Sequence, residues 1–260
     1  MQTGFDGLSE SREPDSWIER AACACRRSWR RGLVAMTVIG AAGWAAVPAA
    51  QAQATPHIYW SNFGTSTVGE ANLPGKDVNQ KFISGADAPE GVAVDSQHIY
   101  WANFGNGTIG RGNLNGTGIN QKFIAGANLV FGVAVDRTHI YWTNAGTGTI
   151  GEANLNGTGM NQKFISGADN PFGLAVDSQH IYWANFGTGT IGDASLAGKN
   201  VNQKFISGAD APQGVAVDST HLYWVNNRTD SIGTANLAGK DVNQMLISGA
   251  SGPAGVAVSG

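Results

Sequence analysis

Residues 91–103 read Gly-Val-Ala-Val-Asp-Ser-Gln-His-Ile-Tyr-Trp-Ala-Asn, two apolar runs joined by short polar residues. β-branched and aromatic residues favour strands, and two polar residues between two such runs predict a tight hairpin. Residues 108–114 and 120–125 form two further short runs, separated by the turn-rich Asn-Gly-Thr-Gly at 115–118. The stretch therefore predicts four short antiparallel strands, which we name A, B, C and D in chain order.

The same unit recurs every 41 residues along the chain. Each copy contains a His-(Ile/Leu)-Tyr-Trp sequence, which begins at His57, His98, His139, His180 and His221. These histidines define five repeats without insertion or deletion, at 57–97, 98–138, 139–179, 180–220 and 221–260. Four strands repeated at a spacing of about 40 residues are typical of propeller blades. We therefore predict an all-β fold, a β-propeller of five four-stranded blades that occupies residues 55–260.

The two ends of the repeat array predict how the ring closes. The array starts at a B strand, at His57, and ends with an A strand, Gly-Val-Ala-Val-Ser-Gly at 255–260. We expect this C-terminal strand to pair with the N-terminal blade, because closure removes the exposed edges of an open array. The alternatives are a gene truncated from six repeats and a ring formed between molecules.

Residues 1–54 precede the repeats and are typical of a cleavable export signal. A basic stretch at 26–31 is followed by an apolar segment from Leu33 to Val47 and by small residues ending at Ala54. The apolar segment is shorter than the roughly 20 residues that cross a bilayer, so no membrane span is predicted. We expect a secreted bacterial protein, extracellular or periplasmic. Cys23 and Cys25 both lie within residues 1–54, so the repeats contain no cysteine.

The charge balance bears on the class of partner. The chain has a formal net charge of −3, with 13% charged residues. Nucleic-acid binding depends on clustered Lys and Arg that neutralise phosphates. This composition therefore argues against a nucleic acid as the partner.

The repeat also resembles a known family. The pattern Pro-x-Gly-(Val/Leu)-Ala-Val-Asp-x-x-x-(Ile/Leu)-Tyr-Trp-x-Asn, followed by Ile-Gly-x-Ala-Asn-Leu-x-Gly, looks like the YWTD or class B repeats of low-density lipoprotein receptors, and more distantly like NHL repeats. The resemblance covers the whole repeat array and implies a propeller, usually of six blades. Where that family has Asp as the fourth motif residue, this chain has an amide, at Asn62, Asn103, Asn144, Asn185 and Asn226. The amide keeps a hydrogen-bonding group but drops the charge, so the family's ligand contacts are not expected here.

Three sets of repeated residues have structural explanations. The five histidines lie on separate blades, about 10 Å or more apart by sheet-packing distances, too far for a shared metal ion. The acids before the A to B turns suit turn capping, namely Asp95, Asp136, Asp177 and Asp218. The tryptophans are expected in the core between blades, namely Trp60, Trp101, Trp142, Trp183 and Trp224. No catalytic residue, metal site or cofactor is predicted.

Positions where one repeat departs from the others point to a ligand-binding face. Residues needed for blade packing should recur in every repeat, whereas residues of a binding site can differ between repeats. The departures cluster in the D to A loops and the B to C loops, which share one face of a propeller. Loops on rigid scaffolds often carry function, and exposed aromatic residues mark binding surfaces. The candidate ligand-binding residues are Phe63, Glu90, Phe104, Phe131, Phe172, Phe186, Gln213 and Arg228. For the phenylalanines of the B to C loops, the alternative is that they fill gaps between blades.

The outer D strands differ in the fifth repeat. Four repeats carry a lysine that guards an exposed strand edge, at Lys81, Lys122, Lys163 and Lys204. The fifth has Met245-Leu246 at these positions. We expect a monomer, with this edge as the place for self-association or partner contact.

Three functions fit these observations. The first is a secreted, non-enzymatic binding protein that presents the loop face to a peptide, glycan or protein partner. The second is an enzyme similar to the streptogramin lyases, which use a histidine and a divalent metal, although every histidine here belongs to the repeat frame. The third is a structural or fragmentary repeat protein without a dedicated site.

Overall fold

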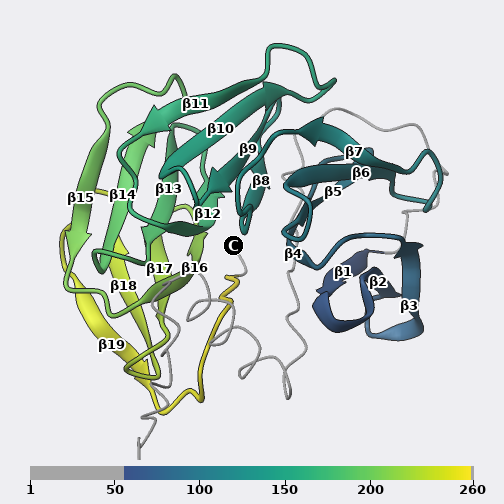
Figure 1. Cartoon of the computed structure of the whole chain (residues 1–260). Helices are drawn as coiled ribbons and strands as arrows, with labels where there is room; N and C mark the ends of the chain where they lie inside the picture. Colours follow the sequence, from purple (N-terminus) through teal and green to yellow (C-terminus); the bar gives the residue numbers. More distant parts are fainter. Residues whose placement is uncertain (1–55, 259–260) are drawn as a thin grey trace, which may run out of the picture. The chain divides into compact units, whose positions relative to one another are not determined.

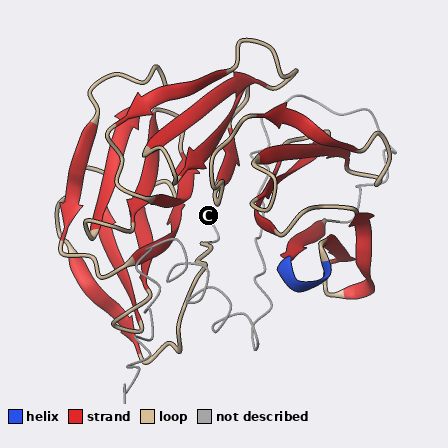
Figure 2. Ribbon diagram, viewed as in Figure 1, coloured by secondary structure: helices blue, strands red, loops and turns tan. Residues whose placement is uncertain are grey.

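The structure is a computed structural model that describes residues 56–258 (Figure 1). The predicted export signal lies outside the described residues. Within them, one short 3-10 helix, η1 (Phe63–Thr65), accompanies an otherwise β-strand architecture (Figure 2). None of the described helical segments has the length and apolar character to cross a membrane.

Five antiparallel sheets follow one another along the chain, and each forms one blade. Blade 1 contains β1 (His57–Asn62), β2 (Thr67–Asn72) and β3 (Lys76–Ser84). Blade 2 contains β4 (Pro89–Val94), β5 (His98–Asn103), β6 (Thr108–Asn113) and β7 (Asn120–Ala125). Blade 3 contains β8 (Val133–Val135), β9 (His139–Asn144), β10 (Thr149–Asn154) and β11 (Asn161–Ser166).

Blades 4 and 5 repeat the arrangement of blades 2 and 3. Blade 4 contains β12 (Pro171–Val176), β13 (His180–Asn185), β14 (Thr190–Ser195) and β15 (Asn202–Ser207). Blade 5 contains β16 (Pro212–Val217), β17 (His221–Asn226), β18 (Ser231–Asn236) and β19 (Asn243–Ser248). The four strands predicted for each repeat are therefore confirmed in blades 2 to 5, in the order A, B, C, D across the sheet.

The core lies between successive blades. Tyr182 and Ile206 of blade 4 pack with Leu222 and Trp224 of blade 5, and all four side chains are buried. Equivalent clusters join blades 1 and 2, 2 and 3, and 3 and 4. Blades 2, 3 and 4 thus have apolar residues on both faces because each face contacts a neighbouring blade. The predicted position in this core is confirmed for Trp101, Trp142, Trp183 and Trp224.

A polar contact accompanies each of these interfaces. The D-strand glutamine of one blade donates from Nε2 to a backbone carbonyl at the end of the preceding blade's D strand, over 2.8–2.9 Å. The four glutamines are Gln121, Gln162, Gln203 and Gln244. Their Oε1 atoms accept from the indole Nε1 of the same blade's tryptophan. One side chain therefore ties the buried Trp of each blade to the neighbouring blade.

The predicted pairing of the C-terminal strand with blade 1 is wrong for the described residues. Blade 1 has three strands, and residues 255–258 have no strand assignment. The C-terminal segment instead contacts blade 5, where Ala254 and Val256 lie against the backbone of Gly214. Phe131 and Val133 lie against Gly91 in the same way. The C-terminal segment is therefore positioned by packing against blade 5, and its described residues form no sheet with β1.

Blade 5 consequently keeps one apolar face uncovered. Ile206 of β15 is 1% exposed beneath blade 5, whereas its equivalent Ile247 of β19 is 55% exposed. Met245 and Leu246 on the same strand are also exposed. Within the described part of the chain, β19 thus carries the apolar residues of an inter-blade interface that no blade covers.

Candidate functional site

The candidate face is formed by the D to A loops and the B to C loops, and we call it the loop face. Within a blade, the two kinds of loop are hydrogen-bonded to each other. In blade 2, the backbone N–H of Phe104 donates to the Ala88 carbonyl over 3.3 Å, and that of Gly105 to the Asp87 carbonyl over 3.0 Å. Blade 4 has the equivalent bond from Phe186 to Asn170, at 3.3 Å. The loops are therefore held by backbone contacts and present their side chains from a fixed frame.

The asparagine at the end of each B strand anchors this frame. Asn144 Oδ1 accepts from the backbone N–H of Asn128 over 3.0 Å, which fixes the D to A loop. Its Nδ2 donates to the Gln162 carbonyl over 3.1 Å and to Thr149 Oγ1 over 3.2 Å. A carboxylate accepts but cannot donate, so this site requires an amide. The two donated bonds, which tie this strand to β10 and β11, therefore explain why Asn stands where the family has Asp.

Four of the predicted residues form a continuous row of aromatic rings, which we call the phenylalanine row. The ring centroids of Phe104 and Phe131 are 4.9 Å apart, those of Phe131 and Phe172 are 4.0 Å apart, and those of Phe172 and Phe186 are 4.6 Å apart. The last two pairs are stacked. Residues from three blades thus meet near the mouth of the central channel.

The structure corrects the expected exposure of this row. Phe131 is 8% exposed and Phe172 is 5% exposed, because each ring is covered by its neighbours on both sides. Phe104 and Phe186, at the two ends, are half-buried. The two end rings therefore remain partly accessible, while the middle rings pack between them.

The other four predicted residues have different positions. Phe63 is half-buried in η1 and Glu90 is half-buried in β4. Gln213 is buried in β16. Arg228 is exposed in the B to C loop of blade 5, where its Nη1 lies 3.0 Å from Asp210 Oδ1. The phenylalanine row is thus the part of the predicted set that the ring contacts bring together.

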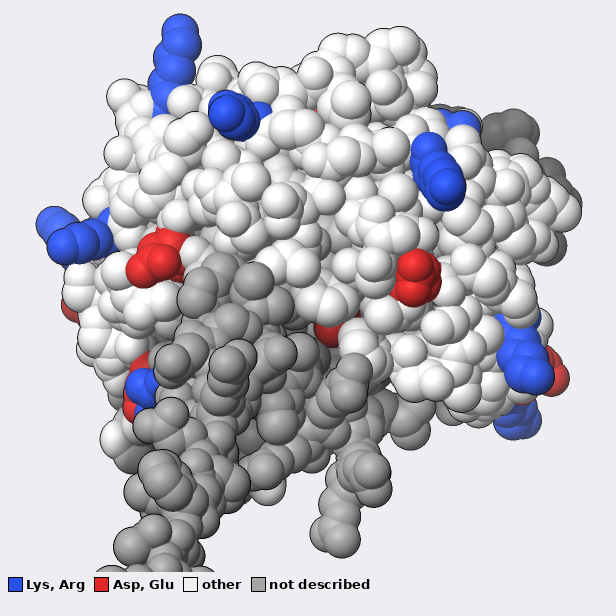
Figure 3. Space-filling model, viewed as in Figure 1, with Lys and Arg blue, Asp and Glu red and all other residues white. Residues whose placement is uncertain are grey.

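Charged side chains do not gather on the view of the molecule in Figure 3. Positive and negative residues are scattered over a largely uncharged surface there, and some of opposite sign lie beside each other at its edges. The face seen in this view therefore carries no basic patch of the kind that binds phosphates.

The opposite face is formed by the A to B and C to D turns, and we call it the turn face. Asp95 Oδ1 accepts from the backbone N–H groups of Gln97 and His98, at 2.7 and 2.6 Å, and Oδ2 accepts from the Tyr100 hydroxyl at 2.9 Å. Burial alone would raise the pKa of Asp95, but these hydrogen bonds lower it below its usual value. Asp136, Asp177 and Asp218 make equivalent bonds. The predicted turn capping is confirmed.

The histidines also belong to this face, and those of blades 1 to 4 lie beside neighbouring acids. His57 Nε2 lies 3.1 Å from Glu70 Oε1, and His98 Nδ1 lies 3.5 Å from Asp95 Oδ2. Over residues 56–258, no three His, Cys, Asp or Glu side chains are grouped as a metal site would require.

Two residues of the turn face escaped the sequence predictions. Arg111 stands where the other blades have Glu70, Glu152, Asp193 and Thr234, and Arg137 stands where blades 2, 4 and 5 have serine. Both line one cavity of the turn face. Like the phenylalanines, both arginines depart from the repeated sequence. They lie in a strand and in an A to B turn, however, and not in the loops of the loop face.

Comparison with protein families matches one stretch of the chain. Residues 138–178 match the model of the low-density lipoprotein receptor repeat class B. No curated protein matches the chain in a sequence comparison.

Solved structures with similar folds include both binding proteins and enzymes. A nidogen/laminin complex matches with a TM-score of 0.68 and 21% identity, over 77% of this chain and 80% of that one. Virginiamycin B lyase from Staphylococcus aureus matches with a TM-score of 0.64 and 16% identity, over 79% and 72% of the two chains. A gluconolactonase from Xanthomonas campestris matches with a TM-score of 0.60 and 18% identity, over 76% and 75%.

At these identities the structural matches establish the fold alone. The class B model spans one whole repeat, and the same residues recur at 41-residue intervals along the chain. The predicted resemblance is therefore confirmed for residues 138–178, and the chain folds as a five-bladed β-propeller.

Proposed function

We propose that this chain is a non-enzymatic binding protein that presents its loop face to a peptide, glycan or protein partner outside the cytoplasm. The observation that carries the proposal is the phenylalanine row. Its members lie at positions where other blades have Ala, Asn, Glu or Gln, so the repeat frame itself does not require aromatic rings there.

The energetics of the row favour a recognition role. Aromatic rings contribute large apolar area with few rotatable bonds, and they dominate the energetic centres of protein interfaces. Phe131 and Phe172 hold the end rings in place, so little entropy is lost when a partner covers them. Arg228, exposed on the same face, adds a charged group at its periphery. A similar fold in a nidogen/laminin complex supports protein as one class of partner.

The test removes the two end rings. We expect a Phe104→Ala/Phe186→Ala variant to weaken binding by tenfold or more, because a central aromatic residue contributes about 2 kcal/mol or more at an interface. Peptide and glycan arrays probed with the wild-type protein supply the ligands, and titration calorimetry of the bound ligands measures the loss.

Alanine is compatible with the loop conformation at positions 104 and 186. Blade 3 carries Ala145 there within the same loop geometry, so the variant should keep its melting temperature. A Lys122→Ala variant on the outer strand β7 serves as the matched control and should bind as the wild type does. Equal binding by the double variant would contradict the choice of face.

We further propose that the chain is monomeric at low concentration and that β19 is its edge for self-association. Met245 is 62% exposed, and Leu246 and Ile247 extend the same apolar edge. Restoring the lysine of the other repeats with Met245→Lys should remove concentration-dependent association in sedimentation velocity, because a charge opposes edge pairing. The exposed Val242→Thr variant is the control. A wild-type protein that stays monomeric at every concentration would argue against this edge.

A further inference from the structure

The turn face contains a cavity that the loop-face proposal does not use. Its volume is about 930 Å³, and it is lined by the A to B turns of blades 2, 3 and 4 together with the C to D turns of blades 3 and 4. Small-molecule sites commonly occupy several hundred cubic ångströms. The cavity is therefore large enough for a ligand of modest size.

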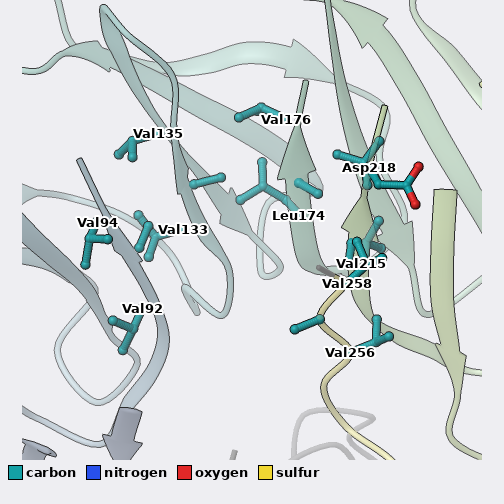
Figure 4. Close-up of a pocket in the computed structure, with 16 residues that line it drawn as sticks. Val92, Val94, Val133, Val135, Leu174, Val176, Val215, Asp218, Val256 and Val258 are labelled. Atoms are coloured by element: carbon teal, nitrogen blue, oxygen red, sulfur yellow. The ribbon is translucent and has the colours of Figure 1, made fainter. Parts of the chain in front are cut away.

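This cavity continues into the central channel. A second cavity of about 340 Å³ lies between the inner strands, and the two share Val94, Val135 and Val176 as lining residues. The wall of the channel is formed by Val, Ala and Leu side chains, with Asp218 as its one charged lining residue (Figure 4). The two cavities together are polar at the turn face and aliphatic inside.

Two arginines make the polar end unlike its equivalents in other blades. Arg111 replaces an acidic residue or threonine, and Arg137 replaces a serine, so two positive charges are added at one cavity. The Arg111 guanidinium lies 4.0 Å from the Phe123 ring centroid, and its Nη1 donates to the Leu155 carbonyl over 3.2 Å. These contacts hold Arg111 in place while further N–H groups stay available. Arg137 is exposed at the cavity rim.

The aspartates in the same cavity are already committed to the turns. Asp95, Asp136 and Asp177 each accept two backbone N–H bonds and a tyrosine hydroxyl bond. Their oxygens thus have internal partners, whereas a guanidinium finds its best partner in a carboxylate, which it can bind through two parallel hydrogen bonds.

We propose that this cavity and the channel form a second binding site, which takes an aliphatic carboxylate: Arg111 and Arg137 hold the carboxylate, and the aliphatic chain enters the valine-lined channel. A small polar ion would use only the arginine half of the site, and an uncharged hydrocarbon would use only the channel. The site is independent of the loop face, which lies at the other end of the blades.

The experiment titrates the protein with sodium decanoate below its micellar range, followed by calorimetry. We expect decanoate to bind at least tenfold more tightly than acetate, which lacks the chain, and than 1-decanol, which lacks the charge. Arg111→Glu and Arg137→Ser should each weaken decanoate binding by roughly tenfold, as expected for losing hydrogen bonds to a charged group. Both replacements are residues that other blades carry at these positions, so the melting temperature should be unchanged.

Two further variants separate the parts of the site. Ala216→Leu narrows the channel and should reduce the advantage of decanoate over acetate while leaving acetate binding unchanged. Phe104→Ala/Phe186→Ala should leave decanoate binding intact, so failure of the loop-face proposal is distinguishable from failure of this one.

Several outcomes would overturn the proposal. One is equal affinity for decanoate and 1-decanol, and another is unchanged decanoate binding by the Arg111→Glu/Arg137→Ser double variant. Binding to phosphatidylglycerol vesicles without binding of free decanoate would also overturn it, because an anionic membrane surface would then be the ligand.

Discussion

A Gly110→Ala substitution is expected to lower the free energy of unfolding by about 3 kcal/mol, near the upper end of overpacking effects. Gly110 of β6 lies opposite Trp101 of β5 in the strand register, and a Cβ atom at Gly110 would overlap the Trp101 indole. That indole is fully buried and donates from Nε1 to Gln121 Oε1 over 2.9 Å. It cannot move aside without losing both its packing and this bond. Thermal unfolding followed by circular dichroism measures the effect.

The matched control lies two residues further along the same strand. A Cβ at Gly112 would have its nearest contact at 3.5 Å, from Ile119 Cγ1, which is ordinary van der Waals distance. The other four blades have alanine at this position, namely Ala71, Ala153, Ala194 and Ala235. Gly112→Ala should therefore stabilise the protein by about 0.4–1 kcal/mol, through the reduced entropy of the unfolded chain. Similar losses in both variants would contradict the role of the Trp–Gly pair.

An Asn144→Asp substitution is expected to cost about 3–5 kcal/mol at neutral pH, as for an unpaired charge left in a buried site. Asn144 is 1% exposed. The new carboxylate would face the Gln162 carbonyl, which now accepts from the Asn144 amide over 3.1 Å. Repulsion would replace this hydrogen bond, whereas a carboxylate oxygen could still accept from the Asn128 N–H. Chemical denaturation at neutral pH measures the loss.

The deficit of this variant should depend on pH. Burial raises the pKa of the introduced carboxyl in the folded state above that in the unfolded chain. The destabilisation is then fully present well above the folded-state pKa and shrinks as the pH falls through it, since the protonated acid can donate one hydrogen bond. Asn115→Asp is the control, because Asn115 is an exposed turn residue whose Oδ1 accepts from the Thr117 N–H, and Asp can do the same. A pH-independent deficit would contradict this explanation.

The local structure of each repeat was predictable because its determinants lie close together in the sequence. The A to B hairpin depends on two apolar runs and on an aspartate that caps the turn within three residues, as Asp95 does. The core position of Trp101 followed from its equivalence to the tryptophans of the other repeats. Strand content and turn chemistry therefore needed no knowledge of neighbouring blades.

The role of the candidate site stays a prediction. Repeat exceptions selected eight residues, of which the structure brings Phe104, Phe131, Phe172 and Phe186 into contact. Their burial was not predicted, since whether one ring covers another depends on distances between loops of different blades. Arg111 and Arg137 were missed because they come from a strand and a turn of different repeats, and only the arrangement of blades brings them to one cavity.

The sequence by itself determined the blade: its four strands, its turns and the apolar faces that require neighbours, because these follow from residue type at short spacing. Only the tertiary structure decided what happens where repetition stops. The C-terminal segment carries a complete A-strand sequence, yet it packs on blade 5 without pairing with β1, and Ile247 is left exposed. A residue's burial depends on the blade that lies against it, and among residues 56–258 no blade covers Ile247.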